Sequence, residues 1–202
     1  RVDMHNNTIA NNRGPSGYGV GLKDMDDAII VDNLFLDNRV GAHLDTSPRE
    51  VDSIGEFSGN VFAYNDIGVE MMPSVRHNMF SANSFVENEE QVAVAGGGTI
   101  RENSWTVNGA GNYWSDYAGY DADGDGQGDM AYKSESLFEN LMQQETLLRL
   151  FIYSPASNAI DFASRAFPLV KPKPKLEDEK PYMAPMIPDA PPLPQEDNRG
   201  WI

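Results

Sequence analysis

Cysteine is absent from this 202-residue chain, and histidine occurs only three times. The lack of thiols excludes disulfide scaffolds, thiolate zinc sites, iron–sulfur clusters and thiol catalysis. Positive charge is also scarce, because 15 Lys and Arg stand against 31 Asp and Glu and give a net charge of −16. Such an acidic chain is repelled by phosphate backbones and anionic lipid, so we expect no nucleic-acid binding. No apolar run reaches the roughly 18 residues of a membrane helix, so we expect no direct membrane span.

A short pattern recurs in the first half of the chain: Asn, any residue, Ile, Phe or Trp, any two residues, Asn. Its copies begin between 20 and 27 residues apart, at Asn7, Asn33, Asn60, Asn83 and Asn103. A bulky apolar residue stands three positions before each copy: Met4, Ile30, Phe57, Phe80 and Ile100. Apolar and polar residues also alternate after the second Asn, which indicates short strands.

Each copy is too short to bury its own apolar side, whereas stacked copies bury a continuous column. The repeat therefore predicts an all-β fold, a right-handed parallel β-helix of about five coils over residues 1–109. In that fold the Ile, Phe and Trp positions face inward. The recurrent Asn residues are expected to stack at the corners and to bond the turn backbone.

Residues 110–133 break the repeat and combine aromatic residues with an acidic loop. Tyr113 and Trp114 are expected to cap the open end of the last coil. The loop that follows places carboxylates at alternate positions, as the first half of a calcium loop does: Asp121, Asp123, Asp125 and Asp129. The twelfth position is Tyr132, where an EF-hand has Glu. Bound calcium and a solvated turn both remain open on this pattern.

Two further segments follow the acidic loop. Apolar residues in 134–167 recur at spacings of three and four, which predicts amphipathic helices, and Ser154 with Pro155 predicts the start of a helix that runs through Ala163. Residues 168–202 hold nine of the 13 prolines and favour extended geometry with no core of their own. This segment is either a disordered tail or an arm that wraps a partner, and its spaced apolar residues favour the arm.

Three stretches carry a family resemblance: Gly111–Tyr117, the Asp121–Asp129 loop and, most specifically, Leu147–Pro168. Together they resemble the C-terminal half of the NosD family, whose N-terminal coils and signal sequence have no counterpart here, so a processed or truncated piece is expected. The resemblance implies a periplasmic accessory protein of an ABC transporter, without enzymatic activity, that handles or delivers copper for the assembly of nitrous oxide reductase. It implies as partners a membrane permease, a copper-chaperone lipoprotein and nitrous oxide reductase itself.

The helices and the arm are the segments expected to dock the transporter. Their apolar residues are the candidate docking residues: Leu147, Phe151, Tyr153, Phe162, Phe167, Tyr182, Met183 and Met186. The resemblance supplies no copper motif, so the metal ligands must come from geometry. Cu(I) favours thioether and imidazole donors.

His77 and Met79 lie two apart in a strand-like segment, alternate to inward Phe80, and so are expected to share an outward face. Met72 at the preceding turn is a third soft donor. We therefore take Met72, His77 and Met79 as the candidate Cu(I) ligands. The alternative reading of these residues is an ordinary solvent-facing strand.

Two rival functions remain open. Asp24, Asp26 and Asp27 follow an inward strand and could serve as acid and base in a polysaccharide-cleaving or polysaccharide-binding β-helix protein. No convergent basic set accompanies them in the sequence. The other rival is a docking scaffold that binds proteins and no metal.

Overall fold

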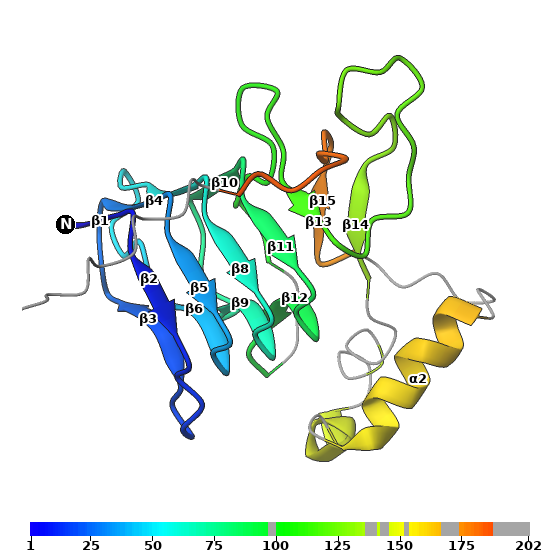
Figure 1. The fold of residues 1–202 in the computed structure, drawn as a ribbon. Coiled ribbons are helices and arrows are strands. Elements are labelled where there is room, and N and C mark those ends of the chain that lie inside the picture. The colour runs from blue at the N-terminus through cyan, green and yellow to red at the C-terminus, as the bar shows by residue number, and fades with distance from the viewer. Residues whose placement is uncertain (97–99, 136–140, 142–145, 152–153, 167–173, 188–202) are drawn as a thin grey trace, which may run out of the picture.

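The structure is a computed structural model, and it describes residues 1–96, 100–135, 141, 146–151, 154–166 and 174–187. Within these residues, short strands follow one another around a coil and pair in parallel with the equivalent strands of the next coil (Figure 1). Three parallel sheets result, which we call faces A, B and C. This is the parallel β-helix that the repeat predicts.

Face A contains β1 (Val2–His5), β4 (Ala28–Val31), β7 (Gly55–Ser58) and β10 (Asn78–Ser81). Face B contains β2 (Thr8–Ala10), β5 (Leu34–Leu36), β8 (Val61–Ala63), β11 (Ser84–Val86) and β13 (Tyr113–Trp114). Face C contains β3 (Tyr18–Lys23), β6 (Val40–Asp45), β9 (Ile67–Met71) and β12 (Glu90–Val94).

The core is a set of columns that run along the coil axis. Phe35, Phe62 and Phe85 are fully buried under face B and stack with ring centroids 4.9 and 5.1 Å apart. Under face A, Phe57 stacks on Phe80 at 4.6 Å. Offset aromatic stacks of this kind add to the burial of apolar area, so each coil stabilises the next one.

Asparagine ladders hold the corners between the faces. Asn60 shows the pattern: its backbone N–H and its Nδ2 both donate to Oδ1 of Asn83, at 3.0 and 2.9 Å, and Nδ2 also donates to the carbonyl of Ile30 at 2.7 Å. Oδ1 of Asn60 in turn accepts two hydrogen bonds from Asn33. Every polar atom of the buried side chain is therefore satisfied, as burial requires.

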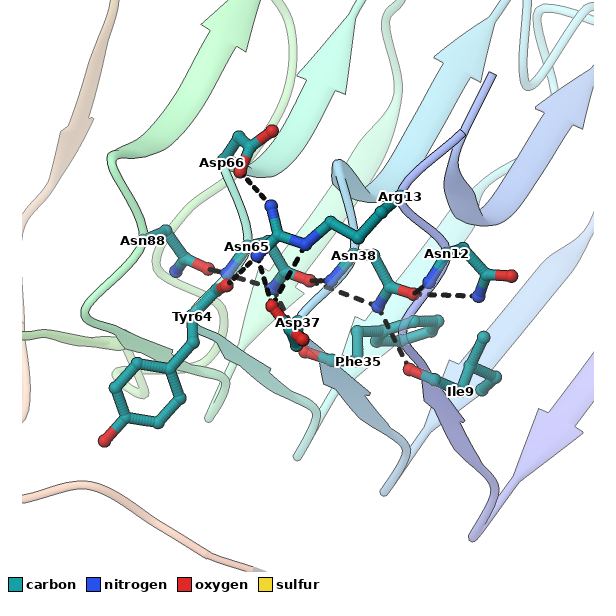
Figure 2. Close-up of polar contacts among 10 residues, drawn as sticks. All are labelled: Ile9, Asn12, Arg13, Phe35, Asp37, Asn38, Tyr64, Asn65, Asp66 and Asn88. Atoms are coloured by element: carbon teal, nitrogen blue, oxygen red, sulfur yellow. Dashed lines mark hydrogen bonds and ion pairs between the residues drawn. The ribbon is translucent and has the colours of Figure 1, made fainter. Parts of the chain in front are cut away.

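Figure 2 shows the second ladder, which joins Asn12, Asn38, Asn65 and Asn88 at the next corner. Arg13 lies over this ladder on the surface and binds the carboxylates of Asp37 and Asp66, which come from the two following coils. The bond to Asp37 raises the pKa of the Arg13 guanidinium. The structure thus supplements the buried amide ladder with an exposed charged clamp.

Face C contains a column of glycines at equivalent positions of the first three coils, which the Asn pattern does not predict. A Cβ on Gly41 would lie 2.5 Å from the carbonyl oxygen of Gly68 and 2.9 Å from the ring of Phe62, and Gly19 and Gly68 are similarly crowded. The fourth coil has Gln91 in register with Gly68. The side chain of Gln91 ends the second ladder, because its Oε1 accepts a hydrogen bond from Asn88 Nδ2 at 2.9 Å.

The described residues form four complete coils and a partial fifth, where about five were expected. The copy that begins at Asn103 was also aligned with the wrong position of the preceding coil. Asn103 bonds Asn78, and Trp105 stacks on Phe80 at 4.3 Å, so this stretch continues face A. The true successor of Asn83 is Asn112, which accepts from Asn83 at 2.9 Å.

Trp114 therefore continues the face B column. Its ring stacks on Phe85 and on Tyr132, each with centroids 4.3 Å apart, and only 1% of it is exposed. The aromatic residue expected to cap the coil thus forms part of an additional layer. An antiparallel pair of strands, β14 (Tyr132–Ser134) and β15 (Leu176–Asp178), lies beyond it.

The segment before β15 contains the 3-10 helix η1 (Thr146–Phe151) and the helix α2 (Pro155–Ala166). The latter begins at the predicted Pro155 and ends three residues beyond the predicted Ala163. In Figure 1, α2 extends away from the coil. In the described part of the chain, no helix has the length and apolarity to span a membrane.

Candidate functional site

The candidate copper ligands lie in the segment that leads from the end of β9 on face C into β10 on face A. Met72 directly follows β9, and its N–H donates to the carbonyl of Leu44 at 2.9 Å. Its side chain is half-buried and packs against the core. Met79 lies on the outward side of β10, in register with Glu56 of the previous coil, and is half-buried. Both thioethers therefore line the surface with limited exposure.

His77 occupies a corner position in place of the expected strand position. Strand β10 begins at Asn78, and His77 has a left-handed backbone with φ of 59°. Alternation along a strand therefore does not relate His77 to Met79. The imidazole is 34% exposed and lies 3.7 Å from a carboxylate oxygen of Glu102, which also pairs with Arg76 at 3.0 Å. The three soft donors follow one another within residues 72–79 but have three different surroundings: the core for Met72, a corner for His77 and the outward side of β10 for Met79.

The acidic loop brings three of its four expected ligands together. Single carboxylate oxygens of Asp121, Asp123 and Asp125 lie within 4.8 Å of one another. Asp129 is engaged elsewhere, because its Oδ2 accepts from the N–H of Ala122 at 2.7 Å.

Backbone amides account for much of this convergence. Asp121 accepts from the N–H of Gly124 at 2.6 Å and from the N–H of Gly126 at 2.9 Å. These bonds, the one from Gly126 first, lower the pKa of the Asp121 carboxyl. The carboxylates therefore accept hydrogen bonds from the backbone of their own turn, and this role explains their spacing without a metal.

The expected docking residues fall into two groups. In the helical segment Leu147, Phe151 and Phe162 are 74, 52 and 76% exposed, and Leu150 is 81% exposed. Tyr153 and Phe167 lie outside the described residues. Large apolar side chains exposed to this degree along one short segment form a surface suited to a partner.

The second group lies on the arm, and the described part of the arm packs on its own coil. Tyr182 donates its backbone N–H to the carbonyl of Asn112 at 2.9 Å and forms an isolated parallel β-bridge with Tyr113. The backbone N–H and carbonyl of Met186 both bond Oγ of Ser84, at 2.8 Å. Met183 is 39% exposed. Residues 174–187 thus contact this chain, where an arm that wraps a partner was expected.

Asp178 on the arm ends the first ladder. The side chain is fully buried, and its Oδ2 accepts from the N–H and Nδ2 of Asn112, at 2.7 and 3.2 Å, and from Nε1 of Trp114 at 2.9 Å. Its Oδ1 accepts from the hydroxyl of Thr106 at 2.7 Å. Oδ1 of Asn112 already accepts from Asn83, so its N–H and Nδ2 donors face the arm, and a carboxylate acceptor satisfies them.

Two members of the acidic trio in the polysaccharide alternative, Asp26 and Asp27, bind a neighbouring loop. Asp26 Oδ1 accepts the N–H groups of Arg49 and Glu50, both at 2.8 Å, and these bonds lower its carboxyl pKa. Asp27 accepts the hydroxyl of Ser53 at 2.9 Å. Both carboxylates anchor the loop after β6.

Sequence reasoning missed a cluster of side chains around His43 on face C. Nδ1 of His43 lies 2.7 Å from Oε2 of Glu70, the residue in register on the next coil. The ring of Tyr18 stacks on the imidazole at 4.5 Å. The signal was present, since His43 and Glu70 hold the same place in successive copies.

The fold defines the class as a parallel β-helix, with soft donors and apolar residues on its outside. A family model described as periplasmic copper-binding protein (NosD) matches residues 1–119. The chain therefore belongs to the NosD family, whose description names the periplasm and copper.

Two relatives share a printed name, probable ABC transporter binding protein NosD. The one from Pseudomonas aeruginosa is 36% identical over 136 residues, which are 67% of this chain and 30% of the relative. The one from Stutzerimonas stutzeri is 30% identical over 191 residues, which are 87% of this chain and 42% of the relative. The chain thus spans less than half the length of these curated relatives.

Proposed function

We propose that this chain binds Cu(I) in the periplasm and serves an ABC transporter as a binding protein without catalytic activity. The observation that carries the proposal is its membership of a family described as periplasmic and copper-binding. The printed names of both relatives support the link to an ABC transporter. The finer proposal is that the bound copper is handed on for the assembly of nitrous oxide reductase, after delivery by a copper-chaperone lipoprotein.

The proposed ligands are Met72, His77 and Met79. Thioether and imidazole donors are those that Cu(I) prefers, and the chain offers no thiolate to compete with them. Methionine side chains have three rotatable bonds, so the half-buried thioethers of Met72 and Met79 can adjust to a metal held by the imidazole of His77. A ligand set made of neutral donors also suits transfer, because it holds copper less tightly than thiolates do.

Cu(I) titration against a competing chelator tests this assignment. Replacing His77 and Met79 with Ala is expected to weaken Cu(I) binding by at least about tenfold, or about 1.4 kcal/mol. The matched control replaces His5 and Met130, an exposed His and an exposed Met elsewhere in the chain, and should leave the affinity unchanged. Equal affinities for both double variants would remove His77 and Met79 from the site.

The proposed contact with the membrane permease is the exposed apolar surface of η1 and α2. The exposure of these side chains supports it, since apolar side chains gain free energy when a partner covers them. Replacing Phe162 with Asp should abolish co-purification with the transporter. The control is Val51→Asp, which changes a residue that is 77% exposed on a loop of the coil. Loss of co-purification in both variants, or in neither, would contradict this location.

A further inference from the structure

Residues 174–187, which we call the closing segment, take the place of one more strand on face B. Tyr113 donates its N–H to the carbonyl of Asn83 at 2.8 Å, and this bond joins β13 to the preceding coil. In the equivalent way Tyr182 donates its N–H to the carbonyl of Asn112 at 2.9 Å, and it pairs in parallel with Tyr113. The closing segment therefore continues the pairing of the coil beyond β13.

Asp178 takes the place of the next ladder asparagine but cannot extend the ladder. A ladder Asn donates to the following coil, as Asn83 does when its N–H and Nδ2 bond Oδ1 of Asn112 at 3.1 and 2.9 Å. Asp178 accepts the N–H and Nδ2 of Asn112 in the same manner, but its carboxylate has no N–H to donate. Its other oxygen accepts the hydroxyl of Thr106 and the N–H of Lys180, at 2.7 and 3.2 Å. The ladder thus ends at this residue.

The acidic loop covers the side of the closing segment that faces away from β13. The N–H of Gly128 donates to the carbonyl of Pro181 at 2.7 Å, and the N–H of Met183 donates to the carbonyl of Gly126 at 3.0 Å. An antiparallel bridge between these bonds joins the loop to the segment. Pro181 has no N–H for a further strand to use. A covering loop and a proline are two of the ways in which proteins protect the edge of a sheet.

The acidic loop also places negative charge at this end of the coil. Carboxylate oxygens of Asp121, Asp123 and Asp125 lie within 4.8 Å of one another, and the last two residues are exposed. Two copies that met through this end would bring their acidic loops together, and the like charges would repel. Charge is a third means of protecting a sheet edge.

The surface under the closing segment is apolar and carries hydrogen-bonding groups. Trp114 is 1% exposed, and its Nε1 donates to Asp178 at 2.9 Å. Leu176 of the segment is 5% exposed and belongs to the same core. Without the segment, the indole of Trp114 and the carbonyl of Asn112 would face solvent at the edge of face B. An apolar strand edge of this kind accepts a strand from another chain.

We propose that the C-terminal end of the coil is a strand-binding surface, which the chain fills with its own residues 174–187 and thereby withholds from a second copy. A second copy is the partner that the fold favours, because the strands of this coil pair in parallel with strands like themselves. This inference goes beyond the proposed copper function and does not depend on it.

A full-length variant with an opened end tests the proposal. Asp178→Ala combined with Tyr182→Pro removes the carboxylate that ends the ladder and the N–H that pairs with Asn112. Size-exclusion chromatography with light scattering measures the mass, and circular dichroism checks that the β-structure is kept. At about 100 µM the opened variant should have a mean mass at least about twice that of the parent chain, which should be monomeric. A synthetic peptide of residues 174–187 in excess should return the variant to the monomeric mass.

The matched control is Asn60→Ala, which breaks the same ladder inside the coil and should leave the chain monomeric. Equal association of this control would overturn the proposal, because lower stability alone would then be the cause. A folded opened variant that stays monomeric, a parent chain that associates as readily, or a peptide without effect would also overturn it. Tyr182→Pro alone keeps Asp178 and repeats the test, with the same expected and contrary results, if the double variant does not fold.

Discussion

The carboxylate of Asp178 joins the arm to the coil, and its removal tests how the ladder ends. In an Asp178→Ala variant the N–H of Asn112 and the indole Nε1 of Trp114 lose their acceptor in a site that is fully buried, whereas Nδ2 of Asn112 keeps the carbonyls of Phe80 and Trp105 as acceptors. Each buried donor left unpaired costs about 1–3 kcal/mol. Water can enter from the opened end and recover part of this loss, so we expect a destabilisation of about 3–5 kcal/mol.

Urea denaturation followed by tryptophan fluorescence measures this effect well. Trp105 and Trp114 are 4 and 1% exposed and lie at this end of the coil, so their emission reports on the capping layer. The matched control is Glu177→Ala, the neighbouring residue, whose surface pair with Lys133 at 3.1 Å is about half exposed. Exposed pairs contribute about 0–1 kcal/mol, so the control should stay close to the parent. A loss below about 1 kcal/mol for Asp178→Ala would refute the reasoning.

Three further predictions concern the coil and the acidic loop. Gly41→Ala should destabilise by about 1–3 kcal/mol because of its crowded Cβ, while Gly14→Ala, with no heavy atom within 4 Å of the new Cβ, should be neutral in the same denaturation assay. Asn60→Ala should lower the free energy of unfolding by about 2–4 kcal/mol in that assay, which is more than Asn7→Ala should. The reason is that Asn60 is fully buried, whereas Asn7 is exposed at the end of the same ladder. Equal losses for the two variants would contradict the ladder account. The pKa of Asp121 is lowered, so its ionised carboxylate stabilises the acidic loop. This stabilisation should be complete above the ordinary carboxyl range and be lost as pH falls through the lowered pKa, and the protection of the loop amides from hydrogen exchange measures it. Asp121→Asn should show no such transition.

The repeat predicted the inward columns well, because burial is decided by a period that the sequence displays. It failed at the last coil for a specific reason. Asn followed two residues later by an aromatic residue occurs at two different corners, before Phe80 and before Phe85, so Asn103 could be aligned with either Asn78 or Asn83. Only the hydrogen bonds of the ladder distinguish the two registers.

The arm shows a second limit of sequence reasoning. Its spaced apolar residues indicated a contact, but nothing in the acidic run of Glu177, Asp178 and Glu179 marks the middle residue as the fully buried one. That choice depends on where the last Asn and the last Trp of the coil meet the arm. His77 likewise looks like a strand residue, and the left-handed turn that places it at a corner follows from the coil as a whole.

The copper assignment is the central claim, and copper K-edge X-ray absorption of the Cu(I)-loaded chain tests it most directly. The account predicts sulfur neighbours at distances typical of Cu(I) thioethers together with one imidazole, and loss of the sulfur contribution when Met72 and Met79 are both replaced with Leu. A spectrum with only oxygen and nitrogen neighbours, or a sulfur contribution that survives this double substitution, would contradict it.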